Sequence, residues 1–221
     1  MQSLTAVVLG ATGLIGEQLV QQLLADSAFS KIRILVRRQV KLSHPKLEVQ
    51  IVNFDNLVEY RSKLGKGDCI FCCIGTTQKK VKGDKIKYRK IDIDIPVNAA
   101  KMAKDAGFTN YLLVSAAGAN AHVSNFYLRL KGEVEKEIAA LNFVSFHAFR
   151  PGILLGDRKE FRLGETIGKG VMQAISGLLI GNLKKYKGIE GADVAKAMIA
   201  AAKSDGTGMF VHHYQDMMKF T

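Results

Sequence analysis

The loop Gly10-Ala11-Thr12-Gly13-Leu14-Ile15-Gly16 decides the fold. It follows the apolar run Thr5–Leu9, which has strand character, and it opens into Leu14–Leu24, whose leucines recur at helical spacing. Glycines at such a junction allow a tight turn, a close approach of backbone to a pyrophosphate, and close packing of helix on strand. Free N–H groups at the helix start favour phosphate. The spacing is GxxGxxG rather than the more usual GxGxxG. The prediction of a dinucleotide-binding loop therefore depends mainly on the strand before the loop and the helix after it.

Strand-like and helical patterns alternate along the rest of the chain. The expected strands are Thr5–Leu9, Ile32–Val36, Leu47–Val52, Cys69–Ile74, Tyr111–Val114, Phe143–Phe149 and Met209–His213. The expected helices are Leu14–Leu24, Asn56–Leu64, Lys85–Ala106 with a kink or restart at Pro96, Val123–Leu141 and Ala192–Ala202. This alternation predicts an α/β, Rossmann-type, doubly wound parallel sheet of order 3-2-1-4-5-6-7. The ligand crevice then lies outside the carboxyl ends of the strands, where the order reverses.

The 221 residues, 48% of them apolar, suffice for a single Rossmann domain over residues 1–221. The stretch 154–186 has many glycines and no clear strand pattern. We expect this stretch to form a small substrate-side cap, and pocket specificity to reside in it.

Several classes of protein are not expected. The apolar start is too short for a signal peptide, and Val171–Leu183 is too short to span a membrane. Cys69, Cys72 and Cys73 are an odd number of cysteines clustered on one short apolar segment, which argues against disulfides and a metal site, and the five histidines lack ligand spacing. We therefore expect buried thiols in a reducing environment, a cytoplasmic location, no bound metal and no membrane association.

Arg37 and Arg38 follow the expected strand Ile32–Val36, where NAD-binding proteins usually carry an acidic residue. A guanidinium holds a 2′-phosphate by a charge-assisted pair, whereas a carboxylate repels it. We therefore expect NADP(H), the competing interpretation being an exposed basic turn. Asp55, after the next strand, either meets the adenine amino group or caps the helix that begins near Asn56.

Tyr127 and Lys131 form a Tyr-x-x-x-Lys pattern, which has about even odds of arising by chance. They share one face of a helix, and Ser115 ends the preceding strand. A free tyrosine has a pKa near 10, and a lysine cation one turn away favours the phenolate. We expect Tyr127 to protonate a substrate carbonyl, Ser115 to bond the same oxygen, and Lys131 to bind the nicotinamide ribose. The competing interpretation is a core aromatic beside a solvated lysine.

These features resemble the short-chain dehydrogenase/reductase superfamily. The stretches Phe71–Thr77, Ser124–Glu135 and Phe149–Arg158 resemble its atypical branch, the Tat-interacting-protein-like oxidoreductases. The resemblance implies NADPH at the carboxyl edge of the sheet, with Gly75 and Thr76 near its ribose and Pro151 to Ile153 flanking the nicotinamide. The expected cofactor residues, those of the loop included, are Gly10, Thr12, Gly13, Leu14, Ile15, Gly16, Arg37, Arg38, Asp55, Gly75, Thr76, Tyr127, Lys131, Pro151, Gly152 and Ile153. One departure is Ala116, where members of the branch often carry a second serine.

The favoured function is an NADPH-dependent oxidoreductase that reduces a small carbonyl compound, with Tyr127 as general acid. One alternative, suggested by the resemblance, is a non-catalytic NADPH-binding redox sensor that regulates a protein partner. Another is an NAD-dependent sugar-nucleotide epimerase or dehydratase. Two features argue against it: Arg37 and Arg38 favour NADP over NAD, and the region after Arg150 is short for a nucleotide-sugar pocket.

A basic cluster accounts for part of the net charge of +12. Its members are Lys79, Lys80, Lys82, Lys85, Lys87, Arg89 and Lys90. Such a cluster could face nucleic acid or an anionic substrate. Few aromatics interleave with it and no nucleic-acid motif accompanies it, so a solvated face is favoured and nucleic acid is not an expected partner.

Overall fold

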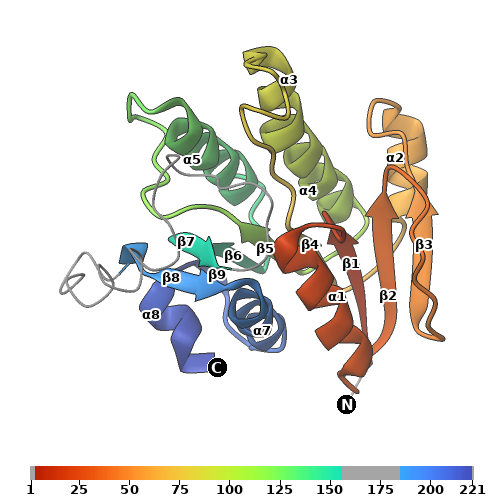
Figure 1. Ribbon diagram of the computed structural model, residues 1–221. Helices are drawn as coiled ribbons and strands as arrows, with labels where there is room; N and C mark the ends of the chain where they lie inside the picture. Colours follow the sequence, from red (N-terminus) through yellow and green to blue (C-terminus); the bar gives the residue numbers. More distant parts are fainter. Residues whose placement is uncertain (1–2, 156–184, 221) are drawn as a thin grey trace.

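A seven-stranded parallel sheet forms the centre of the computed structural model, which describes residues 3–155 and 185–220 (Figure 1). Its strand order is β3-β2-β1-β4-β5-β6-β9, which confirms the predicted order with β9 as the seventh strand. Its strands are β1 (Leu4–Leu9), β2 (Phe29–Val36), β3 (Leu47–Ile51), β4 (Cys69–Cys72), β5 (Asn110–Val114), β6 (Ser145–Phe149) and β9 (Gly208–His212). The order reverses between β1 and β4, so a crevice forms beyond the carboxyl ends of these two strands.

Helices cover both faces of the sheet, as Figure 1 shows. One face carries α1 (Leu14–Ala25), α7 (Gly191–Ala202), α8 (Tyr214–Met217) and the 3₁₀ turn η3 (Met218–Phe220). The other carries α2 (Leu57–Leu64), α3 (Lys85–Arg89), the π-helical turn η1 (Lys90–Asp94), α4 (Ile95–Asp105) and α5 (Phe126–Ala139). Two apolar cores result, one on each face, and the central strands β1, β4 and β5 between them are buried on both sides.

Helix α7 lies along α1. The side-chain amide of Gln22 donates to the carbonyl of Ala192 at 3.0 Å. A Cβ on Gly191 would lie 3.1 Å from the carbonyl oxygen of Leu14, so the two backbones approach closely. Lys203, just after α7, forms a 2.7 Å ion pair with Asp26, just after α1.

The segment expected as one kinked helix divides into three parts. A π-helical turn, η1, lies between α3 and α4, and Pro96 occupies the first turn of α4. Proline tolerates a first-turn position because it has no N–H to donate. The wider π turn places Asp92 in the interior, with 1% of its surface exposed.

Two other expectations are corrected. Helix α5 begins at Phe126 rather than Val123, because the side chain of Asn125 caps it by accepting from the N–H of Leu128 at 3.0 Å. A second, two-stranded parallel sheet pairs β7 (Ile153–Leu155) with β8 (Gly188–Glu190), so strand structure enters the start of the expected cap. Most of that cap, residues 156–184, lies outside the described residues.

Candidate functional site

The glycine loop turns tightly between β1 and α1. Gly10 has a φ of +78°, and a Cβ there would lie 2.7 Å from the carbonyl group of Cys73. The N–H of Gly13 donates to the carbonyl of Gly10 at 3.0 Å, which closes the turn. A Cβ on Gly16 would lie 2.1 Å from the same Gly10 oxygen. Gly13, at the N-cap of α1, has no side chain to cap the helix, so the first N–H groups of α1 remain available for an anion.

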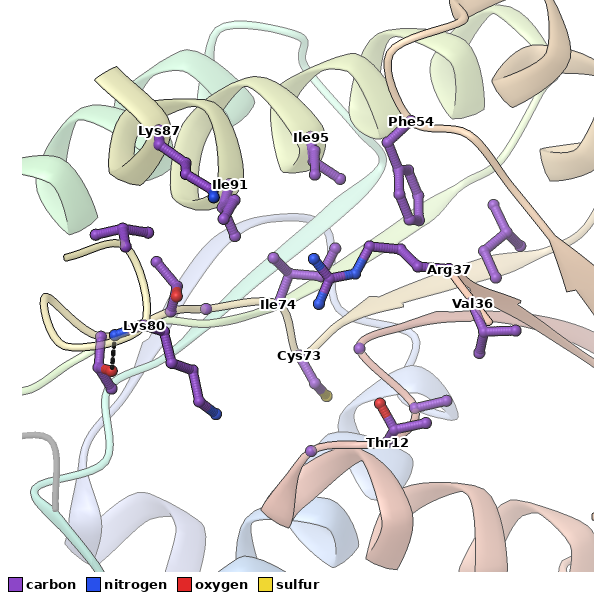
Figure 2. Close-up of a pocket in the computed structure, with 18 residues that line it drawn as sticks. Thr12, Val36, Arg37, Phe54, Cys73, Ile74, Lys80, Lys87, Ile91 and Ile95 are labelled. Atoms are coloured by element: carbon purple, nitrogen blue, oxygen red, sulfur yellow. Dashed lines mark hydrogen bonds between the residues drawn. The ribbon is translucent and has the colours of Figure 1, made fainter. Parts of the chain in front are cut away.

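A cavity of about 530 Å³ opens beside this loop, at the carboxyl ends of β1, β2 and β4 (Figure 2). The loop after β4, the helix α3 and the turn η1 complete its walls. Of the predicted cofactor residues, those that line it are Gly10, Thr12, Gly13, Arg37, Gly75 and Thr76. The cavity therefore lies at the place in the sheet that the strand order predicts for a ligand.

Three cations line the cavity: Arg37, Lys80 and Lys87. No carboxylate lies among the described residues that form its walls. Figure 2 shows Arg37 extended across the cavity toward Ile74. Arg38 is exposed but does not line the cavity, so of the two adjacent arginines expected at the cofactor only Arg37 lies at this site. This charge distribution suits a polyanionic ligand.

Apolar residues that sequence reasoning missed line the wall beyond Arg37. Phe54 follows β3 and packs edge-on against Tyr60, with ring centroids 4.8 Å apart. Ile91 and Ile95, from η1 and α4, lie on the same side of the cavity. The position of Phe54 just beyond a strand end was a usable signal, because the carboxyl ends of parallel strands share one edge. Together these residues offer flat apolar surface beside the cationic wall.

Asp55 lies apart from the cavity lining. Its carboxylate forms a 2.8 Å ion pair with Lys90, and both side chains are about half exposed. The neighbouring Asn56 caps α2 by accepting from the N–H of Glu59 at 3.1 Å. The cap therefore belongs to Asn56, and Asp55 instead links the end of β3 to the turn η1.

The loop after β4 is held in place by two side chains from the segment that follows it. The N–H of Thr76 donates to Oδ2 of Asp92 at 2.8 Å, and the hydroxyl of Tyr88 donates to the carbonyl of Thr76 at 3.0 Å. All three residues are buried. The backbone at Gly75 and Thr76 is thus fixed at the cavity wall.

Lys131 and Ser115 are both buried with acidic partners. The Nζ of Lys131 lies 3.1 Å from Oδ1 of Asp92. The hydroxyl of Ser115 donates to Glu135, which also accepts from the guanidinium of Arg150, with Nε at 3.0 Å. Sequence reasoning did not anticipate either acid, although Glu135 shares a helix face with Lys131.

Tyr127 is partly buried and packs against the core that α5 shares with α4. It lies one turn before Lys131, as the spacing predicts, but neither residue lines the cavity. Pro151 is buried, and its carbonyl accepts from the N–H of Ala117 at 2.9 Å. A Cβ on Gly152 would lie 2.7 Å from the Lys187 carbonyl oxygen, so this turn packs tightly against the chain entering β8.

The three cysteines are free thiols at and just after β4. Burial raises the pKa of the Cys69, Cys72 and Cys73 thiols, which keeps them protonated and weakly nucleophilic. Within residues 3–155 and 185–220, no group of three or more His, Cys, Asp or Glu side chains gathers as a metal site would require. No helix in the same ranges has the length and apolar character needed to cross a bilayer.

Comparison with known proteins identifies the family. A family model described as NAD(P)H-binding matches residues 10–205, a span that includes the glycine loop, the cavity and α7. This chain belongs to that NAD(P)H-binding family. Protein HTATIP2 of Rattus norvegicus is 35% identical over 172 residues, which cover 76% of this chain and 70% of that protein. This relative confirms the expected resemblance to Tat-interacting-protein-like proteins.

Fungal members of the NAD(P)H-binding family correct the expected location. Protein FMP52-1, mitochondrial, of Scheffersomyces stipitis is 35% identical over 205 residues, covering 90% of this chain and 88% of that protein. Further relatives, from Eremothecium gossypii and Candida albicans among others, are also named mitochondrial. The prediction of a cytoplasmic location is therefore wrong. Free thiols indicate a reducing environment but do not identify which compartment provides it.

Solved structures show the same fold. A UDP-N-acetylglucosamine 4-epimerase from Methanobrevibacter ruminantium has a TM-score of 0.69 at 17% identity, with 96% of this chain and 77% of that chain covered. MoeE5 in complex with UDP-glucose and NAD has a TM-score of 0.67 at 16% identity, with 94% and 74% covered. At identities of 16% and 17%, the similarity concerns the fold alone, and it carries no information about the substrate of this protein.

Proposed function

We propose that this protein is an NADPH-dependent oxidoreductase of the short-chain dehydrogenase/reductase type that reduces a small carbonyl compound. The observation that carries the proposal is the cavity beside the glycine loop, where three cations line the walls and no described lining residue is acidic. A dinucleotide with a 2′-phosphate is a polyanion that fits such a site. Arg37 would hold the 2′-phosphate, the N-terminus of α1 the diphosphate, and the wall near Phe54 the adenine.

A reduced nicotinamide bound in this site would supply a hydride to the carbonyl carbon. Tyr127 would give the proton of its hydroxyl to the carbonyl oxygen, so that the alcohol product is neutral. Lys131, one turn further along α5, would be positioned by Asp92. Ser115 would orient the substrate oxygen once its hydroxyl proton turns away from Glu135.

The test is a screen of aldehydes and ketones with the purified protein and NADPH, following loss of nicotinamide absorbance. Tyr127→Phe should abolish turnover while the dissociation constant for NADPH stays within about two-fold of the wild-type value, because the ring is retained. Wild-type turnover in Tyr127→Phe would refute the assigned role of this tyrosine.

A second candidate is a non-catalytic NADPH-binding regulator, and one observation favours it. Lys131 and Ser115 are both buried against acids of this chain, Asp92 and Glu135. These internal pairings hold the two groups that the reductase mechanism assigns to the substrate oxygen and the nicotinamide ribose. On this hypothesis NADPH binds tightly, no carbonyl compound is reduced, and protein partners captured with NADPH differ from those captured without it. Identical partners in both captures would refute the regulator.

A further inference from the structure

The structure divides the basic cluster between Lys79 and Lys90 into parts with different surroundings. Arg89 pairs with Glu133, and Lys90 pairs with Asp55. Lys80 and Lys87 line the cavity beside the glycine loop. The cluster is therefore not one uniform solvated face, because two of its members belong to the candidate ligand site.

Local backbone structure fixes both lysines at the cavity wall. The N–H of Lys80 donates to Oγ1 of Thr77 at 3.3 Å, in a turn that continues directly from the loop after β4. The chain then reverses through Lys82 and Gly83, whose φ angles are +53° and +78°. Asp84 caps α3 by accepting from the N–H of Lys87 at 2.9 Å. The placement of these lysines thus follows from a turn and a cap encoded within eleven residues, Thr77–Lys87.

The two lysines and Arg37 come from different walls. Arg37 follows β2, whereas Lys80 and Lys87 belong to the segment after β4. Figure 2 shows Lys87 extending from the α3 side of the cavity and Thr12, of the glycine loop, on the opposite side. A ligand anion held at the N-terminus of α1 therefore meets helix N–H groups on one side and lysine ammonium groups on the other.

We propose that Lys80 and Lys87 bind the diphosphate of the dinucleotide, opposite the N-terminus of α1, whereas Arg37 recognises the 2′-phosphate. This inference rests on the proposed dinucleotide function and adds a second phosphate-binding wall to it. NADPH and NADH share the diphosphate, so the lysines contribute equally to both affinities. Only NADPH has the 2′-phosphate, so Arg37 sets the preference between them.

The experiment is titration of the whole protein with NADPH and with NADH, reading dissociation constants from nicotinamide fluorescence. The test variant is Lys80→Gln with Lys87→Gln. The matched control is Lys79→Gln with Lys85→Gln, which removes the same charge from exposed residues of the same segment that do not line the cavity. Arg37→Gln serves as the selectivity standard.

The Lys80/Lys87 variant should bind both dinucleotides at least about ten-fold more weakly, with the ratio of the two constants within about two-fold of wild type. The control should match wild type, and Arg37→Gln should lose NADPH affinity alone. A Lys80/Lys87 variant that binds like the control, or that loses only NADPH affinity, overturns the inference and leaves the proposed function intact. Wild-type protein that binds neither dinucleotide overturns both.

Discussion

The Nζ of Lys131 lies 3.1 Å from Oδ1 of Asp92, and each side chain has at most 2% of its surface exposed. The second oxygen of the same carboxylate accepts from the N–H of Thr76. One buried acid therefore joins α5, the π-helical turn and the loop that forms the cavity wall. This acid therefore connects the predicted catalytic helix to the loop that lines the cavity.

Asp92→Asn should lower the free energy of unfolding by about 3–5 kcal/mol, because it leaves the Lys131 cation buried without its counter-charge. Urea denaturation measures this change. Asp55→Asn is the control, since its ion pair with Lys90 is half exposed and worth at most about 1 kcal/mol. Adding Lys131→Met to Asp92→Asn should recover part of the loss, because no buried charge then remains. Equal stability of Asp92→Asn and wild type would show that this pair contributes nothing.

Glu135→Gln should destabilise the protein by about 2 kcal/mol, less than Asp92→Asn, because its partner Arg150 is partly exposed. The amide keeps the shape of the carboxylate but removes the charge that Arg150 and Ser115 face. Glu133→Gln, on the same helix, is the matched control, since Glu133 pairs with exposed arginines. Thermal and urea unfolding compare the two. Similar losses in both variants would contradict a special role for Glu135.

Gly10→Ala should abolish dinucleotide binding. The alanine would have to adopt a φ of +78°, which L side chains rarely do. Its Cβ would lie 2.7 Å from backbone atoms of Cys73, so β1 and the loop after β4 would have to separate. Gly107→Ala provides the comparison, because Gly107 also has a positive φ but nothing lies within 4 Å of its Cβ position. It should cost about 1 kcal/mol of stability and leave the dissociation constant unchanged. Tight NADPH binding by Gly10→Ala would contradict the proposal that the dinucleotide binds against the backbone of this loop.

Stability should fall as the pH falls from about 6.5 to about 4. His147 is buried in β6, bonded to His212 at 2.9 Å, and burial lowers its pKa to about 4. Between these values the unfolded chain binds a proton that the folded chain excludes, so stability present above pH 6.5 is lost on acidification, at up to about 1.4 kcal/mol per pH unit.

Urea denaturation at pH 7.5, 6 and 5 measures that slope. His147→Phe, which keeps a ring between Phe149 and Phe210, should reduce the slope without abolishing it, because burial also lowers the pKa of His212 and His213. His122→Gln changes an exposed histidine and should retain the wild-type slope. A slope in His147→Phe as steep as that of wild type would assign the pH dependence to other groups.

The sheet order and the glycine loop could be predicted because they depend on local signals. Alternating strand and helix patterns with right-handed crossovers allow few parallel topologies, and the glycine-rich loop after the first strand favours the Rossmann order among them. The loop at Gly10 is recognisable because glycine is needed where φ is positive and backbones approach closely. Arg37 directly follows a buried strand and lines the cavity, whereas its contact with the cofactor stays a prediction.

The partners of the predicted catalytic residues could not be read from the sequence. Asp92 lies 39 residues before Lys131, and only the π-helical turn orients it inward. Lys80 and Lys87 looked like part of a solvated cluster, because composition does not distinguish a lysine facing water from one facing a cavity. The short strands β7 and β8 escaped prediction because three residues carry too little periodicity.

The packing of α7 along α1 predicts when, during translation, nucleotide binding is acquired. The glycine loop is made well before the helix that packs beside it, which ends at Ala202. A nascent chain halted before that residue would carry every element of the phosphate-binding turn without the neighbour that holds it. Nucleotide binding should therefore be acquired late in translation, and a stop codon ahead of α7 should remove it even though the whole turn is present.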